Sequence, residues 1–505
     1  MDSERIQTCL DLMHEARQLP VDDAQRRLLE QAAGELVRDG RLRRRAEGRA
    51  ARAAVDAKLL AATAMGARDR VMDAALSAPA PPERGLTVGE YVRLRPGSSA
   101  ESRLPDRTPD SDGPSRLLNR PQRCYVCKNH YRHVHDFYHL LCPPCAGENL
   151  AHRTTRTDLT GRRALLTGGR VKIGFQVALM LLRDGAELTV TSRFPQDTVR
   201  RFAAAPGAAD WWHRLRIAAL DLRDPRQVLA FTDHMLAQGL PLDVLINNAA
   251  QTLRRSPEVY TALCAAETTP ITPTPAALLP PQVWTAPGFS VPGPRTTPLP
   301  WTAELAPRFR APHALAGTAH TADTSVAAPP SQEGVDEAGL LPETTATNSW
   351  TLRLGQIDPT ELLEVQLVNA VAPFLLADRL LPLLDASPHP HRYLINVSAV
   401  EGQFTVRNKT GDHPHTNMAK AALNMLTRTS AADLATRGIH TCSVDTGWVT
   451  DEKPLPARNR HAATGWRPPL DIVDGAARIY HPIVQGQAGS PLHGVLLKDY
   501  QQVPW

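Results

Sequence analysis

Four cysteines stand in two close pairs, and thiols at this spacing can hold a metal ion. Cys124 and Cys127 flank two residues, and a second pair, Cys142 and Cys145, begins after 14 intervening residues. Two such pairs supply four soft thiolates, which close a tetrahedral site and leave no position for water. The spacing therefore predicts a structural zinc module rather than a catalytic metal. The alternatives are a redox pair, chance, or replacement of one cysteine by an intervening histidine: His130, His133, His135 or His139.

A glycine-rich turn between an apolar strand and an apolar helix supplies a second chemistry. The strand at residues 163–167 runs directly into Gly168, Gly169 and Gly174, and apolar residues then recur at helical spacing. Glycines allow the backbone to approach a pyrophosphate, and the N-terminus of the following helix favours its negative charge. In this context the turn predicts binding of a dinucleotide.

The end of the next apolar strand bears on which dinucleotide is bound. Residues 187–191 are followed by Ser192 and Arg193, with no acidic residue at the tip. An acidic residue there would bind the ribose hydroxyls of NAD, whereas an arginine favours the 2′-phosphate of NADP. The pattern favours NADP over NAD, with an ordinary surface role as the alternative for Arg193.

These residues need a framework, and the chain supplies alternating strands and helices. Further apolar strands end at residues 220–222, 243–247, 393–397 and 440–444, and apolar helices contain Asn369 and Lys420. Alternation of this kind predicts an α/β fold with a doubly wound parallel sheet, as in Rossmann domains.

The order and spacing of these motifs resemble the short-chain dehydrogenase/reductase family over residues 160–255 and 350–500. The matching motifs are Thr167-Gly168 with Gly174, Asp221-Leu222, Asn247-Asn248-Ala249, Asn369, Ala419-Lys420-Ala421-Ala422 and Thr446-Gly447-Trp448-Val449-Thr450. The resemblance implies an NAD(P)-dependent oxidoreductase that transfers a hydride to or from a carbonyl or alcohol, with a small molecule as its substrate.

The resemblance also implies roles for single residues. Asp221 is expected at the adenine, Lys420 at the nicotinamide ribose, and Asn369 beside a water in a proton relay. The full set expected to bind the cofactor is Thr167, Gly168, Gly169, Arg170, Lys172, Ile173, Gly174, Ser192, Arg193, Asp221, Leu222, Asn248, Ala249, Lys420, Thr446, Gly447 and Val449.

The sequence departs from the family at the chemical centre. The family's catalytic tyrosine lies four residues before the lysine, where this chain has Thr416, and the serine position falls on Ala399, next to Ser398. A threonine hydroxyl is far too weak an acid to replace a phenol by itself. Lys172 replaces a loop glycine, which brings a cation near the phosphates, and Thr446 replaces a proline.

Three hypotheses follow from these departures. In the first, the chain is an oxidoreductase in which His415 or His413 handles the proton, with Asp412 as an orienting group. Its catalytic residues would then be Lys420, Asn369, Ser398, Thr416 and His415. In the second, the chain is an inactive cofactor-binding scaffold or redox sensor. In the third, which the sequence favours least, the Arg-rich residues 41–52 and the cysteine module bind nucleic acid.

The 505 residues divide into six segments by composition. Residues 1–78 read as helical, with a break near Asp39 and Gly40, residues 79–120 as a linker, and residues 121–152 as the zinc module. The Rossmann domain occupies residues 158–255 and 349–505. Between its two parts, residues 256–348 are rich in Pro, Thr and Ala and predict a disordered or lid-like insertion. The apolar helix at residues 361–384 is suited to a homo-oligomer, because members of the family are commonly dimers or tetramers.

Bulk composition narrows the remaining possibilities. A formal charge of +5 is small for this length and does not by itself indicate nucleic acid. No apolar run has the length of a transmembrane helix, and no apolar signal core stands at the N-terminus. The cysteines outside the cluster are scattered, which suits a reducing compartment. We therefore expect a cytoplasmic protein that has no membrane partner.

Overall fold

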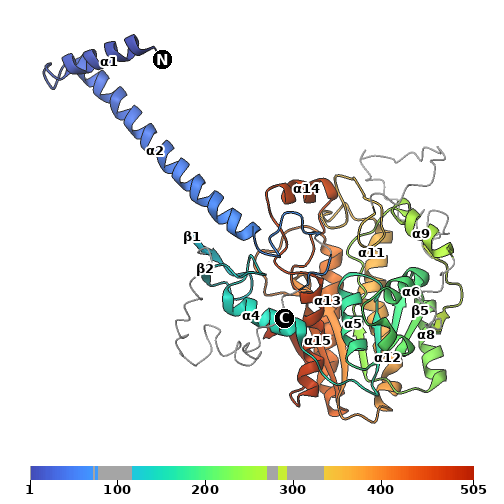
Figure 1. The fold of residues 1–505 in the computed structure, drawn as a ribbon. Helices are drawn as coiled ribbons and strands as arrows, with labels where there is room; N and C mark the ends of the chain where they lie inside the picture. The colour runs from blue at the N-terminus through green and yellow to red at the C-terminus, as the bar shows by residue number, and fades with distance from the viewer. Residues whose placement is uncertain (1, 72–73, 78–115, 270–281, 293–334) are drawn as a thin grey trace, which may run out of the picture.

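A nine-stranded sheet forms the body of the molecule, from which a helical arm projects (Figure 1). The computed structural model describes residues 2–71, 74–77, 116–269, 282–292 and 335–505. Every neighbouring pair of strands is parallel except the pair of β10 and β11 at one edge. The strands lie in the order β11 (Gln501–Val503), β10 (Val495–Lys498), β9 (Ile439–Asp445), β8 (Arg392–Ser398), β6 (Val244–Asn247), β3 (Arg163–Thr167), β4 (Glu187–Ser192), β5 (Leu215–Ala219) and β7 (Gln282–Thr285).

The strands are apolar because helices cover both faces of the sheet. Residues of β6, β8 and β9 are buried along their whole length, as expected for strands inside a parallel sheet. One apolar core joins the sheet to α5 (Lys172–Arg183), α6 (Pro195–Ala203) and α15 (Ile472–Gln487). A second core joins it to α8 (Pro225–Gln238), α12 (Ala372–Asp385) and the end of α13 (Pro414–Thr436). The predicted doubly wound α/β fold is confirmed.

The strand order fixes where a ligand would bind. Strand β3 pairs with β4 on one side and with β6 on the other, so the chain reverses its direction of winding at β3. Ligands of doubly wound sheets bind outside the carboxyl ends of the strands at such a point.

One long helix, residues 359–385, carries much of the second layer. It consists of α11 (Pro359–Gln366), a π-helical turn (Leu367–Val371) and α12. Within the described part of the chain it is the one helix long and apolar enough to cross a membrane, with a mean hydropathy of 1.6. Half of that stretch is buried, and the helix packs on α8 and α13, as a core helix of the domain does.

The cysteine module is built on the body rather than beside it. It comprises β1 (Leu117–Arg123), β2 (His130–His133) and α4 (Pro143–Thr154), so it begins earlier than the predicted boundary at residue 121. Arg153 on α4 contacts Asp471 at 2.5 Å and Asp474 at 3.1 Å, and all three side chains are buried. Burying these charges is tolerable because each has an opposite partner, and the same pairing docks α4 onto α15.

The N-terminal arm consists of α1 (Ser3–Ala16) and α2 (Ala24–Ala61). Helix α2 continues through Asp39 and Gly40, so the break predicted there is wrong. The chain turns earlier, between α1 and α2. The carboxylate of Asp56 accepts hydrogen bonds from the backbone of Asn119 and Arg120, which fastens the end of α2 to β1.

The Pro/Thr/Ala-rich insertion contains ordered elements, so the prediction of disorder is wrong for these described residues. These elements are a 3₁₀ helix (Pro257–Tyr260), α9 (Thr261–Thr268) and β7, which extends the sheet by pairing with β5. Val259, Leu263 and Leu340 pack around Phe194. These few apolar side chains are enough to fix this part of a largely polar segment on the body. Residues 270–281 and 293–334 of the predicted insertion lie outside the described residues.

Candidate functional site

A cleft of about 1140 Å³ opens at the carboxyl ends of the central strands. It is lined by residues that follow β3, β4, β5 and β6, so it lies where the strand order reverses. The residues that the sequence predicted for the cofactor and that line this cleft are Gly168, Arg170, Lys172, Ile173, Gly174, Ser192, Arg193, Asp221, Leu222, Asn248 and Ala249.

The floor of the cleft is a hydrogen-bonded clamp between the ends of β3 and β6. The hydroxyl of Thr167 accepts hydrogen bonds from the backbone amides of Asn248 and Ala249, both at 3.0 Å. In return, the side-chain amide of Asn248 donates to the carbonyls of Thr167 and Gly168. A Cβ added to Gly174 would lie 2.1 Å from the Gly168 carbonyl oxygen, so only glycine fits there.

The N-terminus of α5 faces the cleft without a side-chain cap. Val171 occupies the N-cap position and makes no capping hydrogen bond through its side chain. The first amides of a helix have no partner within the helix and attract anions, phosphates above all. Gly169, which was also predicted to bind the cofactor, packs on Val190 instead: a Cβ there would lie 2.7 Å from Val190.

Lys172, at the first position of α5, has a backbone that suits glycine better. Its φ is +54°, in the left-handed region that costs a residue with a side chain about 1–2 kcal/mol. This is the position at which the resemblance expects a glycine, so the lysine side chain is retained against a local conformational cost. Strain of this kind often accompanies a functional role.

The far end of the cleft is rich in arginine. Arg193 follows β4 and stacks over the rings of Phe194 and Tyr260. The hydroxyl of Ser192 is occupied, because it accepts from the Phe194 amide at 3.0 Å and from Thr198. Arg170 is bound to Asp197 at 2.6 Å.

Asp221, expected at the adenine, is held by a neighbouring guanidinium. Burial raises the pKa of its carboxyl, but Arg223 outweighs burial through charge and hydrogen bonds, and the net pKa is lowered. Arg223 lies 2.6 Å from Asp221 and 3.4 Å from Glu364, so it connects the end of the cleft at Asp221 to α11. Sequence reasoning missed Arg223 and Glu364, since only the folded chain brings them together.

Lys420 is buried beneath the carboxyl end of β8. Its ammonium donates to the carbonyl of Val397 at 2.8 Å. Burial, opposed in part by Glu401, lowers the pKa of Lys420 to about 8. The ammonium form therefore predominates at neutral pH, while proton exchange near neutrality becomes accessible.

Three polar groups of the predicted catalytic set are buried without a hydrogen-bond partner among the described residues. They are the Ser398 hydroxyl, the Thr416 hydroxyl and Nδ1 of His415. A buried polar group left unpaired costs about 1–3 kcal/mol, so these three positions carry a local cost.

Asn369 lies in the π-helical turn of the long helix. Its side chain forms two hydrogen bonds with the backbone of Gln251, accepting at 2.7 Å and donating at 3.0 Å. These bonds fix the loop after β6 and occupy the side chain. A relay water at Asn369 would therefore have to bind a backbone group. A π-helical turn can leave such a group without its usual helical hydrogen bond.

His415 pairs with Glu361 rather than with the predicted Asp412. Nε2 of His415 lies 3.3 Å from a Glu361 oxygen, and Glu361 lines the cleft. Asp412 binds Arg353 at 2.9 Å, and the ring of His413 stacks on Trp350. Asp412 therefore does not pair with His415, and its predicted role as an orienting group is left to His413 alone.

The segment after β9 contributes different residues from those predicted. Thr450 and Glu452 line the cleft, whereas Thr446, Gly447 and Val449 do not. Val449 is only 3% exposed and lies in the core shared with the cysteine module. The residues predicted to be catalytic also do not line the cleft: Lys420, Asn369, Ser398, Thr416 and His415. Two of them contact residues that do, because Asn369 is hydrogen-bonded to Gln251 and His415 to Glu361.

The four cysteines converge as predicted. Their sulfur atoms all lie within 4.8 Å of one another, and those of Cys127 and Cys142 are 3.7 Å apart. A tetrahedral zinc with Zn–S bonds of about 2.3 Å requires sulfurs about 3.8 Å apart. Hydrogen bonds with Cys142 and Cys145 lower the pKa of Cys124. Hydrogen bonds with Cys124 and Cys142 raise the pKa of Cys145. Four thiols this close need a cation before all can ionise.

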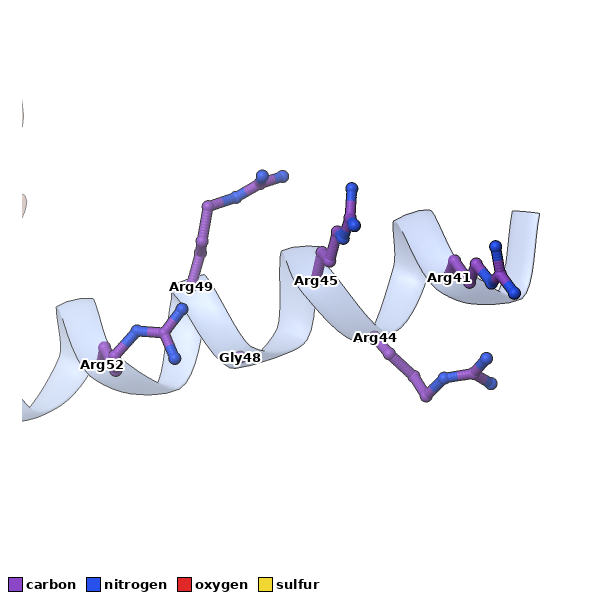
Figure 2. Close-up of a pocket in the computed structure, with 6 residues that line it drawn as sticks. All are labelled: Arg41, Arg44, Arg45, Gly48, Arg49 and Arg52. Atoms are coloured by element: carbon purple, nitrogen blue, oxygen red, sulfur yellow. The ribbon is translucent and has the colours of Figure 1, made fainter. Parts of the chain in front are cut away.

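The arginine-rich part of α2 forms no convergent site. Figure 2 shows Arg45 and Arg49 extending from one side of the helix and Arg44 from the other, spread along its length. The shallow region around them lies on α2 alone, in the arm and apart from the strand ends.

The strand order, the glycine turn and the cleft define a dinucleotide-binding α/β protein. Two family models match the chain: short chain dehydrogenase over residues 162–267, and Enoyl-(Acyl carrier protein) reductase over residues 338–463. The chain belongs to the short-chain dehydrogenase/reductase family, as a divergent member with an additional four-cysteine module.

Individual proteins resemble the chain to differing extents. An uncharacterized protein of Acanthamoeba polyphaga mimivirus is 29% identical over 382 residues, which are 71% of each chain. A probable oxidoreductase of Streptomyces antibioticus is 43% identical, but over 18% of this chain and 30% of its own length. The solved structure of NADPH-bound carbonyl reductase from chicken fatty liver aligns with 69% of this chain at 16% identity and a TM-score of 0.40.

Replacing Lys172 with glycine tests whether the turn is strained. Because glycine adopts a positive φ without penalty, we expect Lys172→Gly to raise the free energy of unfolding by up to about 1 kcal/mol. Denaturant unfolding of the two proteins measures the difference. The same substitution at Arg183, near the end of α5 with ordinary helical geometry, should destabilise by about 1 kcal/mol. Equal losses from both substitutions would show that Lys172 is not strained.

Proposed function

We propose that this chain is an NADP-dependent oxidoreductase that reduces a carbonyl or oxidises an alcohol without the tyrosine of its family. The observation that carries the proposal is the cradle at the ends of β3 and β6, beside the uncapped N-terminus of α5. When bound, the nicotinamide supplies or accepts the hydride, and the residues of this chain position it and move the proton.

The cradle fits a dinucleotide through the chemistry of its residues. Gly168 and Gly174 leave the turn open to a pyrophosphate, and Lys172 adds positive charge at the same helix end. Arg193 stands where a 2′-phosphate would lie, and no acidic residue follows β4 to bind a ribose hydroxyl. These features support NADP rather than NAD.

The proton requires a new donor, because Thr416 stands in the place of the tyrosine. We assign this role to His415, which Glu361 holds at 3.3 Å from the side of the cleft. An imidazole can give a proton to a carbonyl oxygen. Lys420 would hold the nicotinamide ribose, and the hydroxyls of Ser398 and Thr416 would donate to the substrate oxygen.

The four-cysteine site would hold a structural zinc ion. The sulfur separations match a tetrahedral thiolate shell, and Cys124, Cys142 and Cys145 are buried. Four thiolates complete the coordination of zinc, so the ion would stabilise the module and take no part in the reaction.

Two neighbouring helices carry exposed apolar side chains that suit a homo-oligomer. Val371 and Phe374, on the long helix, are 38% and 50% exposed. Met418 and Met425, on α13, are 59% and 52% exposed. Because α13 packs on α11 and on the π-helical turn, these side chains come from adjacent elements.

The first test joins cofactor binding to turnover. We expect the purified protein to bind NADPH more tightly than NADH and to oxidise NADPH when aldehydes or ketones are added. His415→Ala should lower kcat by about 100-fold or more while the Kd for NADPH stays within about twofold.

His440→Ala is the matched control, because His440 is also buried but lies at the amino end of β9. Its kcat should match that of the wild type. Tight NADPH binding with no turnover on any carbonyl would favour the inactive scaffold instead. Unchanged turnover in His415→Ala would remove His415 from the mechanism.

A metal measurement tests the cysteine site. Elemental analysis of the native protein should find one zinc ion per chain, and Cys145→Ser should lose it and unfold at a lower temperature. Cys9→Ser, an exposed cysteine of the arm, should keep both the metal and the melting temperature. A metal-free native protein that melts like the variant would rule out the zinc site.

Sedimentation tests the proposed oligomer. We expect the wild type to sediment as a dimer or larger at micromolar concentration, and Phe374→Glu as a monomer, because a charge in the interface would be buried without a partner. Leu240→Glu, at an exposed position after α8, should leave the assembly intact. A monomeric wild type would contradict the proposal.

A further inference from the structure

The cysteine module and the segment after β9 share one apolar core. Cys124, Phe137 and Tyr138 of the module lie in the same buried cluster as Val449 and Leu470. The module therefore completes its interior with side chains from the body, and those side chains belong to the segment that leads from β9 to α15.

A single hydrogen bond joins the first cysteine pair to this segment. Tyr125 lies between Cys124 and Cys127, and its hydroxyl accepts from the backbone amide of Trp448 at 2.8 Å. The backbone of Tyr125 is fixed in turn by the second half of the module, since its amide donates to the carbonyl of Leu140 at 2.8 Å.

The loop has little freedom where Tyr125 meets it. Gly447 has a φ of +78°, and a Cβ there would lie 2.6 Å from Leu470 and 3.5 Å from the Tyr125 hydroxyl. The chain at this point therefore follows the surface of the module closely, and a shift of the module would shift the loop.

The other side of the loop reaches the cofactor cradle. Val449 and Ile173, the second residue of α5, both pack against Gly475 of α15, within 3.2 Å of where a Cβ would lie. One residue beyond Val449, Thr450 lines the cleft, and Glu452 does so next. Residues 446–452 thus contact the module at one end and the cleft at the other.

We propose that Tyr125 is a positioning residue, through which the metal-bound module sets the loop 446–452 against the cleft. The inference rests on the proposed nucleotide site and adds to it: the occupancy of the cysteine site would govern how firmly the cleft holds the nicotinamide half of the dinucleotide. The adenine half would lie at the ends of β4 and β5, whose following residues line the other part of the cleft.

Binding of two ligands distinguishes a positioning role of Tyr125 from a general effect on the stability of the protein. We expect Tyr125→Phe to raise the Kd for NADPH about two- to tenfold, the amount that one lost hydrogen bond provides. The Kd for adenosine 2′,5′-bisphosphate, which lacks the nicotinamide half, should not change. Equal weakening of both ligands, or no weakening of either, would overturn the proposal.

The matched control is Tyr131→Phe in the same module. The hydroxyl of Tyr131 donates to the carbonyl of His139 at 2.8 Å and so makes an equivalent bond that stays within the module. This variant should bind both ligands like the wild type. A selective loss of NADPH affinity in Tyr131→Phe would show that any weakening of the module has the same effect.

Hydrogen exchange keeps the proposal testable even if the chain binds no nucleotide. Amides of residues 448–452 should exchange faster in Tyr125→Phe, and in the wild type after chelation of its metal, but not in Tyr131→Phe. If those amides exchange at wild-type rates in all three samples, the positioning role is refuted. If only nucleotide binding is missing, the proposed function fails and the positioning role stands.

Discussion

The cleft depends on the hydroxyl of Thr167, which joins the carboxyl ends of two parallel strands. Parallel strands bring their ends to one edge of a sheet, but side by side they would leave unpaired backbone amides there. Thr167 accepts from two of these amides, and Asn248 returns two hydrogen bonds to the glycine turn. The turn is thereby held open in a shape that leaves the N-terminus of α5 facing outward.

The sequence predicted the sheet well because its signals are local. Each buried strand is a short apolar run, and a glycine turn between a strand and a helix has few other interpretations. Elements that depend on partners far away in the chain were not predicted. Strand β7 stands in a Pro/Thr/Ala-rich stretch and is recognisable as a strand only through its pairing with β5. The break expected at Gly40 also failed, since one glycine costs a long helix only about 1 kcal/mol.

The candidate site shows the same division. The spacing of the four cysteines and the distance from Thr416 to Lys420 are visible in the sequence, and both refer to residues close in the chain. Other contacts in the site join residues that are far apart in the chain. Glu361 lies 54 positions before His415, and Arg223 lies 141 positions before Glu364. No periodicity encodes such contacts, so the sequence pointed to Asp412, a near neighbour in the chain, and could not show that Glu361 pairs with His415.

The docking of the cysteine module has a consequence for the order in which the chain can fold. Arg153 finds Asp471 318 residues further on, and Tyr125 finds Trp448 323 residues further on. During synthesis the module leaves the ribosome long before those partners exist, and closing so long a loop is slow. Until the last part of the sheet and α15 are made, Arg153 lacks its buried partners and the apolar core of the module stays open. The small N-terminal module is therefore among the last parts of the molecule to reach its final structure, although it is among the first to be translated.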